Sequence, residues 1–130
     1  MKNSVIDVAI IGAGTAGTFA ANQLTAAGLH CSIVEKSRGL GGRCSRRNVL
    51  DDYSIDLGAA SFSLPYIDHP NIIKNLHKWL KAGFIEEWLF SSNDFEAIFP
   101  CMKKVELCGS PSMNALHRHL AEGVNCLTQQ

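Results

Sequence analysis

The sequence predicts an α/β fold that opens with a strand, a helix and a second strand, and three features of its first 35 residues predict it. An apolar run covers residues 5–11, an alanine-rich segment covers 15–27, and a second apolar run covers 31–34. Buried parallel strands are commonly continuous apolar runs, and Gly28 stands where a glycine often follows the last turn of a helix. We therefore expect two parallel strands joined by a helix.

The turn between the first strand and the helix is rich in glycine. Gly12, Gly14 and Gly17 have the spacing Gly-x-Gly-x-x-Gly. In such a turn the first glycine permits a sharp bend, the second lets the backbone approach a diphosphate, and the third lets the helix pack closely on the strand. The unpaired N–H groups at the helix start then face the anion. The pattern predicts a binding site for a dinucleotide diphosphate.

An acid follows the second strand at the position that this interpretation requires. Glu35 lies eighteen residues beyond Gly17. A carboxylate there can accept hydrogen bonds from both hydroxyl groups of an adenosine ribose. The alternative is an incidental glycine turn followed by a surface glutamate. The order of strand, helix, strand and acid favours the nucleotide site.

Composition excludes several other classes of protein. The chain has 130 residues, is 46% hydrophobic, and has 12 basic and 12 acidic residues for a formal net charge of zero. These values fit one soluble globular domain without the basic surface of a general nucleic-acid binder. The N-terminal apolar run is too short to span a bilayer and lacks the features of a signal peptide. We expect a cytoplasmic protein with no membrane or nucleic-acid partner.

Metal binding is not expected from the cysteines and histidines. The five cysteines are scattered, odd in number and without Cys-x-x-Cys spacing. His117 and His119 are two residues apart on a predicted helix, which directs their side chains to different sides. The sequence therefore predicts free thiols and no metal site.

A second cluster of candidate ligands follows Glu35. Residues 36–47 contain the glycine pair Gly41-Gly42 and no acid, and their basic side chains are Lys36, Arg38, Arg43, Arg46 and Arg47. A glycine pair lets the main chain lie close to a ligand, and an arginine can make a forked contact to phosphate. The alternative for this stretch taken alone is a solvated basic loop.

A helix and a hairpin are expected in the middle of the chain. Apolar residues at helical spacing between Pro70 and Gly83 predict a helix, in which Trp79 either packs in the core or stacks on a cofactor. Segments 84–90 and 95–99 predict an antiparallel hairpin. Its acids either face a cationic substrate or only face water; they are Glu86, Glu87, Asp94 and Glu96.

The last part of the chain predicts a return to the parallel sheet. Ser110 followed by Pro111 has the pattern of a capped helix start, and the helix is expected to stop at Gly123. This start either binds an anion or is an ordinary cap. Residues 124–127 then predict the next parallel strand.

A longer pattern within residues 35–58 resembles a known family. Glu35, Gly41-Gly42-Arg43 and Asp56-Leu57-Gly58 together are similar to the extended FAD-binding pattern of the glutathione-reductase-like flavoproteins, in the amine oxidase and phytoene desaturase branch. Within that branch, the amino-acid sequence of residues 35–39, 56–59 and 109–113 most resembles renalase and its bacterial relatives.

The resemblance implies a Rossmann-like FAD/NAD(P)-binding βαβ unit followed by the beginning of an inserted α+β substrate domain. It implies that 1–130 is the N-terminal part of the cofactor-binding domain, that 63–108 starts the insertion, and that the fold is incomplete relative to the family. The exposed edges of so small a parallel sheet favour self-association. The cofactor-binding residues are expected to be Gly12, Ala13, Gly14, Thr15, Ala16, Gly17, Glu35, Lys36, Ser37, Arg38, Gly41, Gly42, Arg43 and Ala59.

The implied function is an FAD-dependent oxidoreductase whose flavin accepts a hydride from a dihydronicotinamide-like or amine donor, with NAD(P)H as a candidate reductant. Lys36 and Arg43 are expected on the phosphate side, and the tight Gly58-Ala59 step is expected to bring backbone amides and Ala59 toward the flavin. No catalytic residue is assigned. One alternative is a non-catalytic module that binds only the ADP part of a cofactor. Another is a direct NAD(P)H-binding dehydrogenase domain, in which Glu35 favours NAD over NADP.

Overall fold

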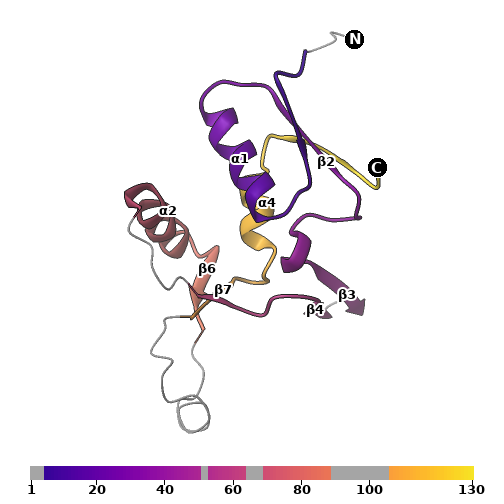
Figure 1. Ribbon diagram of the computed structural model, residues 1–130. Coiled ribbons are helices and arrows are strands. Elements are labelled where there is room, and N and C mark those ends of the chain that lie inside the picture. The colour runs from indigo at the N-terminus through magenta and orange to yellow at the C-terminus, as the bar shows by residue number, and fades with distance from the viewer. Residues whose placement is uncertain (1–4, 51–52, 64–68, 89–105) are drawn as a thin grey trace, which may run out of the picture.

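The computed structural model describes residues 5–50, 53–63, 69–88 and 106–130. A parallel sheet with its helices forms one part of the molecule, and a small antiparallel sheet with helix α2 forms a second part beside it (Figure 1). Helix α4 lies between the two.

The parallel sheet contains β1 (Val8–Ile11), β2 (Cys31–Glu35) and β8 (Asn125–Thr128), with β2 in the middle. Val8 pairs with Cys31 and Ser32 pairs with Asn125, and both ladders are parallel. Helix α1 (Thr15–Ala26) connects β1 to β2 and ends before Gly28, whose φ of 89° is a conformation that glycine adopts freely. The predicted α/β class with a parallel sheet is confirmed.

One face of this sheet carries its core. Ala21 of α1, Ile33 of β2 and Ala121 after α4 pack in one cluster, which Ile10 joins. The next residue, Ile11, is 82% exposed because successive strand residues point to opposite faces. β1 and β8 are the two edges of the sheet. Self-association through these edges stays a prediction.

The second part is a three-stranded antiparallel sheet covered by a helix. Its strands are β5 (Phe62–Ser63), β7 (Glu106–Gly109) and β6 (Ile85–Glu87), in that spatial order. Helix α2 (Pro70–Lys81) begins at a proline, as the sequence predicts, and packs apolar side chains against β6 and β7.

The two parts share a core. Leu116 and Leu120 of α4 (Ala115–Leu120) pack with Ile85 and Leu107 of the antiparallel sheet. Trp79 of α2 meets Phe19 of α1 edge to face, with ring centroids 6.0 Å apart. Trp79 is therefore a packing residue between the two parts.

A two-stranded hairpin extends from the parallel sheet. It consists of β3 (Arg46–Leu50) and β4 (Tyr53–Asp56), and it follows the short 3-10 helix η1 (Gly42–Cys44). The strand that the sequence predicts to end at Asp56 is confirmed by β4. Its end lies near the glycine-rich corner, which makes this hairpin relevant to the site.

The predicted start of the last helix is wrong. Ser110 and Pro111 lie in a bend, and α4 begins at Ala115 after Asn114. Gly109 explains the difference, since a Cβ there would lie 2.4 Å from the Ser112 carbonyl oxygen, so the chain folds back on itself here. Contacts of Met113 with Asp56 and of Asn114 with Leu40 hold this bend in place of a first helical turn.

The predicted hairpin over 84–90 and 95–99 can be followed only in part. β6 lies within its first segment and pairs with β7. Residues 89–105, with Asp94 and Glu96, lie outside the described residues. The division into a cofactor domain and an insertion over 63–108 stays a prediction.

Candidate functional site

The corner between β1 and α1 is built as the glycine spacing predicts. Gly12 has a φ of 96°, which favours glycine, and its N–H donates to the Val34 carbonyl oxygen at 2.8 Å. A Cβ on Gly17 would lie 2.0 Å from the Gly12 carbonyl oxygen. Only glycine at position 17 lets the helix lie this close to the turn.

The start of α1 is open to a ligand. Gly14 is the N-cap residue, and no side chain caps the helix. A Cβ built on Gly14 would meet no atom within 4 Å, and Thr15 and Ala16 are exposed. Uncapped N–H groups and the positive end of the helix dipole favour an anion at such a position.

Glu35 is turned toward this corner. Its Oε2 accepts a hydrogen bond from the Ala13 N–H at 2.7 Å. Its Oε1 accepts from the Ser37 N–H at 2.8 Å and from the Ser37 hydroxyl at 2.7 Å. These bonds, the one from Ala13 first, lower the pKa of Glu35 below its ordinary value.

The carboxylate of Glu35 keeps capacity for a ligand. A carboxylate offers about four acceptor positions, and the protein uses three of them, so Oε2 retains one. The residue is 6% exposed, and the hydrogen bonds to both oxygens orient its carboxylate at the corner. The acid that the sequence places after β2 thus lies against the glycine-rich turn.

The glycine pair Gly41-Gly42 lies against the glycine-rich turn between β1 and α1. The Gly41 N–H donates to the Ala13 carbonyl oxygen at 2.8 Å, and Gly41 and Gly42 have φ values of 119° and 55°. A Cβ on Gly42 would lie 3.3 Å from the Gly14 Cα. The backbone of the 41–42 loop therefore approaches the same space as Gly14.

Residues 57–59 are joined to the segment after this glycine pair. The Ala59 N–H donates to the Arg43 carbonyl oxygen at 2.8 Å, and a Cβ on Gly58 would lie 2.0 Å from that same oxygen. This hydrogen bond occupies the Ala59 N–H, while the predicted approach of the Gly58-Ala59 step to a flavin stays untested. A contact of Ala59 with the flavin through other atoms stays a prediction.

Four of the five basic side chains in this region are free to meet an anion. Lys36, Arg38, Arg43 and Arg47 are exposed, and none forms an ion pair with a carboxylate of the described residues. Arg46 differs, since its guanidinium donates to the Ser112 hydroxyl at 3.3 Å and to the Asn48 amide oxygen at 3.2 Å. The basic stretch therefore divides into exposed groups and one structural arginine.

Residues 112–117 contact the segments around this corner, and the sequence did not indicate these contacts. The Met113 N–H lies 3.3 Å from Asp56 Oδ1, and the Asn114 amide donates to the Leu40 carbonyl oxygen at 3.4 Å. His117 Nε2 lies 2.9 Å from the Thr15 hydroxyl. These partners are 57 to 102 residues apart in the chain, so no local spacing indicates them.

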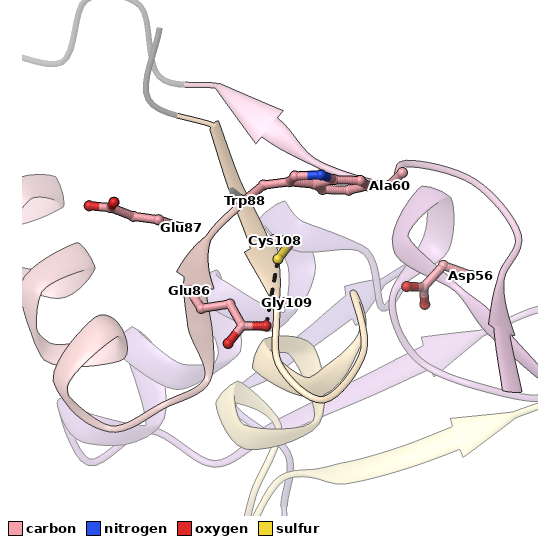
Figure 2. Close-up of a pocket in the computed structure, with 7 residues that line it drawn as sticks. All are labelled: Asp56, Ala60, Glu86, Glu87, Trp88, Cys108 and Gly109. Atoms are coloured by element: carbon pink, nitrogen blue, oxygen red, sulfur yellow. Dashed lines mark hydrogen bonds between the residues drawn. The ribbon is translucent and has the colours of Figure 1, made fainter. Parts of the chain in front are cut away.

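An acidic hollow lies beside the end of β4. Its volume is about 320 Å³, and its lining residues are Asp56, Ala60, Glu86, Glu87, Trp88, Cys108 and Gly109. Figure 2 shows the Glu86 carboxylate beside the Cys108 thiol, 3.9 Å away, while the Glu87 carboxylate points elsewhere. Burial, and then Glu86, raise the pKa of the Cys108 thiol, so it is protonated at neutral pH.

Within residues 5–50, 53–63, 69–88 and 106–130, no three side chains of His, Cys, Asp or Glu are grouped closely enough to hold a metal ion. Over the same part of the chain, no helix is both long and apolar enough to cross a bilayer.

Together, the strand, glycine turn, helix, second strand and inward-facing acid define a dinucleotide-binding βαβ domain. The family model described as "NAD(P)-binding Rossmann-like domain" matches residues 10–78, just over half of the chain. The chain belongs to this family.

Curated relatives are similar to less than half of the chain. A carotenoid 3,4-desaturase from Haloarcula japonica is 41% identical over 59 residues, which are 45% of this chain and 12% of that protein. A zeta-carotene-forming phytoene desaturase from Myxococcus xanthus is 37% identical over 60 residues, 46% of this chain and 11% of that protein. The similarity therefore covers less than half of this chain and about a tenth of each relative.

Proposed function

We propose that the chain is the cofactor-binding part of an FAD-dependent oxidoreductase of the renalase-like and amine oxidase type. The observation that carries this proposal is the position of the Gly41-Gly42 loop against Gly14, hydrogen-bonded to Ala13. A domain that binds only NAD does not need such a loop after the acid that binds the ribose. A longer cofactor such as FAD, which extends from the corner toward a second layer, would contact this loop.

The residues at the corner fit the ADP part of FAD. The space beside Gly14 is open to a diphosphate, and the uncapped start of α1 supplies N–H donors. In this proposal the backbone of Gly12–Gly17 holds the diphosphate, Glu35 holds the ribose, and Lys36, Arg38 and Arg43 supply positive charge. Gly41 and Gly42 let the main chain approach the cofactor.

Glu35 also favours one kind of nucleotide. Its low pKa keeps it ionised at neutral pH, so it accepts hydrogen bonds from ribose hydroxyl groups and repels a 2′-phosphate. Ser37 holds one oxygen of this carboxylate, which leaves the other toward the corner. The preferred ligand therefore carries an adenosine with a free 2′-hydroxyl, as FAD and NAD do.

The bound flavin would supply the redox chemistry by accepting a hydride from a dihydronicotinamide-like or amine donor, with NAD(P)H as a candidate reductant. The residues of this chain bind and orient the cofactor. No side chain is assigned a part in hydride transfer. The similarity to two desaturases supports a function as an oxidoreductase. The amino-acid sequence of residues 35–39, 56–59 and 109–113 supports the assignment to the renalase-like branch.

Cofactor binding is tested by incubating the purified chain with FAD, removing free FAD and recording the visible spectrum. A retained yellow flavin whose absorbance is bleached by a dihydronicotinamide supports the proposal. A colourless chain that binds ADP but not FAD would instead support a non-catalytic ADP- or NAD(P)-binding module. Absence of binding to either ligand would contradict both functions.

A further inference from the structure

The geometry points to His117 as a positioning residue for the dinucleotide: its imidazole holds the hydroxyl of Thr15 and so fixes the start of helix α1 that faces the diphosphate. This inference rests on the proposed dinucleotide binding. It adds a residue that lies outside the glycine-rich turn, and 102 positions from Thr15 along the chain.

His117 is buried where a polar group needs a partner. His117 is 3% exposed, and its Nε2 lies 2.9 Å from the Thr15 Oγ1. A hydroxyl can both donate and accept, so this contact forms with either neutral tautomer of the ring. Burial lowers the pKa of His117, which keeps the imidazole neutral near pH 7.

Thr15 occupies the position where this contact matters for a ligand. It is the first residue of α1, directly after Gly14, and it is exposed beside the open space there. The side chain of a threonine in a helix populates two rotamers. Holding the hydroxyl in one of them orders the first turn before a ligand arrives, which removes an entropic cost of binding.

A second contact between the same helices separates positioning from simple docking. The Asn22 amide donates to the Leu120 carbonyl oxygen at 3.3 Å, so α4 also holds α1 two turns away from the corner. Loss of either contact weakens the packing of α4 on α1. Loss of the His117 contact alone should change the affinity for the dinucleotide.

The experiment measures ADP affinity by isothermal titration calorimetry on the full 130-residue chain, together with the thermal midpoint of each ligand-free variant. The variants are His117→Phe, His117→Gln, Thr15→Val, the double variant with His117→Phe and Thr15→Val, and Asn22→Ala. Phenylalanine keeps the ring without its nitrogens, glutamine places an amide near the position of Nε2, and Asn22→Ala is the matched control.

We expect His117→Phe to weaken ADP binding by roughly five- to tenfold, the size of one lost hydrogen bond. His117→Gln should restore the affinity to within about twofold of the wild type. Thr15→Val and the double variant should bind equally weakly, because His117 acts through the Thr15 hydroxyl, which is absent from both, although this hydroxyl also meets the Cys44 thiol. Asn22→Ala should lower the thermal midpoint and leave the affinity unchanged.

If the wild type binds ADP, two results would overturn the positioning role of His117. One is an unchanged affinity in His117→Phe. The other is an Asn22→Ala loss as large as the His117→Phe loss. If His117→Phe does not fold, the comparison of His117→Gln with Thr15→Val decides: equal weakening of both contradicts the inference, and weakening of Thr15→Val alone supports it. A wild type that binds no ADP contradicts the proposed function itself.

Discussion

Replacing Glu35 by alanine should destabilise the ligand-free protein by an amount that its hydrogen bonds set. Its Oε2 accepts a hydrogen bond from the Ala13 N–H, and Ala13 has no exposed surface, so removing the carboxylate leaves a buried donor without its charged partner. A hydrogen bond to a charged group contributes about 1.5–3 kcal/mol. Ser37 is exposed, and water can replace the carboxylate at both of its donors. The Ala13 bond therefore sets most of the loss.

The expected decrease in the free energy of unfolding at pH 7 is about 1.5–3 kcal/mol, measured by urea denaturation. For a domain of this size the thermal midpoint should fall by roughly 6–12 °C. Ser37→Ala is the control, since it removes only the hydroxyl donor to Oε1, and it should cost less than about 1 kcal/mol. A loss below about 0.5 kcal/mol in Glu35→Ala would refute the reasoning.

The pH dependence gives a second check on the same carboxylate. Because the pKa of Glu35 is lowered in the folded state, its stabilisation is fully present above its unfolded pKa, about 4.3, and is lost as the pH falls through the folded pKa. The stability difference between the wild type and Glu35→Gln should therefore stay constant from about pH 7 to 5 and shrink below about pH 4. A constant difference across that acid range would contradict the assigned pKa direction.

Three other substitutions test the corner and its support. Gly14→Val should change the free energy of unfolding by no more than about 1 kcal/mol, because a Cβ there meets no atom within 4 Å, yet it should abolish ADP binding measured by calorimetry. Gly17→Ala should cost about 1–3 kcal/mol in the same urea assay, since its Cβ would lie 2.0 Å from the Gly12 carbonyl oxygen, and unchanged stability would contradict the close packing. Gly39→Ala is the control, with open space around its Cβ. The lowered pKa of His117 means that the unfolded chain binds a proton more readily, so wild-type stability should fall as the pH drops below about 6.5, and His117→Phe should remove that part of the decrease.

Much of the corner could be predicted from local patterns. The parallel strands, helix α1 and the positions of Gly12 and Gly17 follow from apolar runs and glycine spacing, which act over a few residues. The start of α2 at Pro70 follows for the same reason. Glu35 could be placed at the corner because the end of one parallel strand lies beside the end of its neighbour.

The sequence could not show what holds the loops around that corner. Ser110 and Pro111 have the pattern of a helix start, yet Met113 bonds to Asp56 and Asn114 to Leu40, and these long-range contacts keep the segment in a bend. The Ala59 N–H likewise donates to the Arg43 carbonyl oxygen, a contact between residues that are far apart in the chain.

The sequence alone thus determined the class of fold and predicted a dinucleotide site, because turn geometry and strand periodicity are local properties of the backbone. Only the tertiary structure decided which donors are already paired and which histidine supports Thr15, because partners 102 residues apart meet only after the chain has folded.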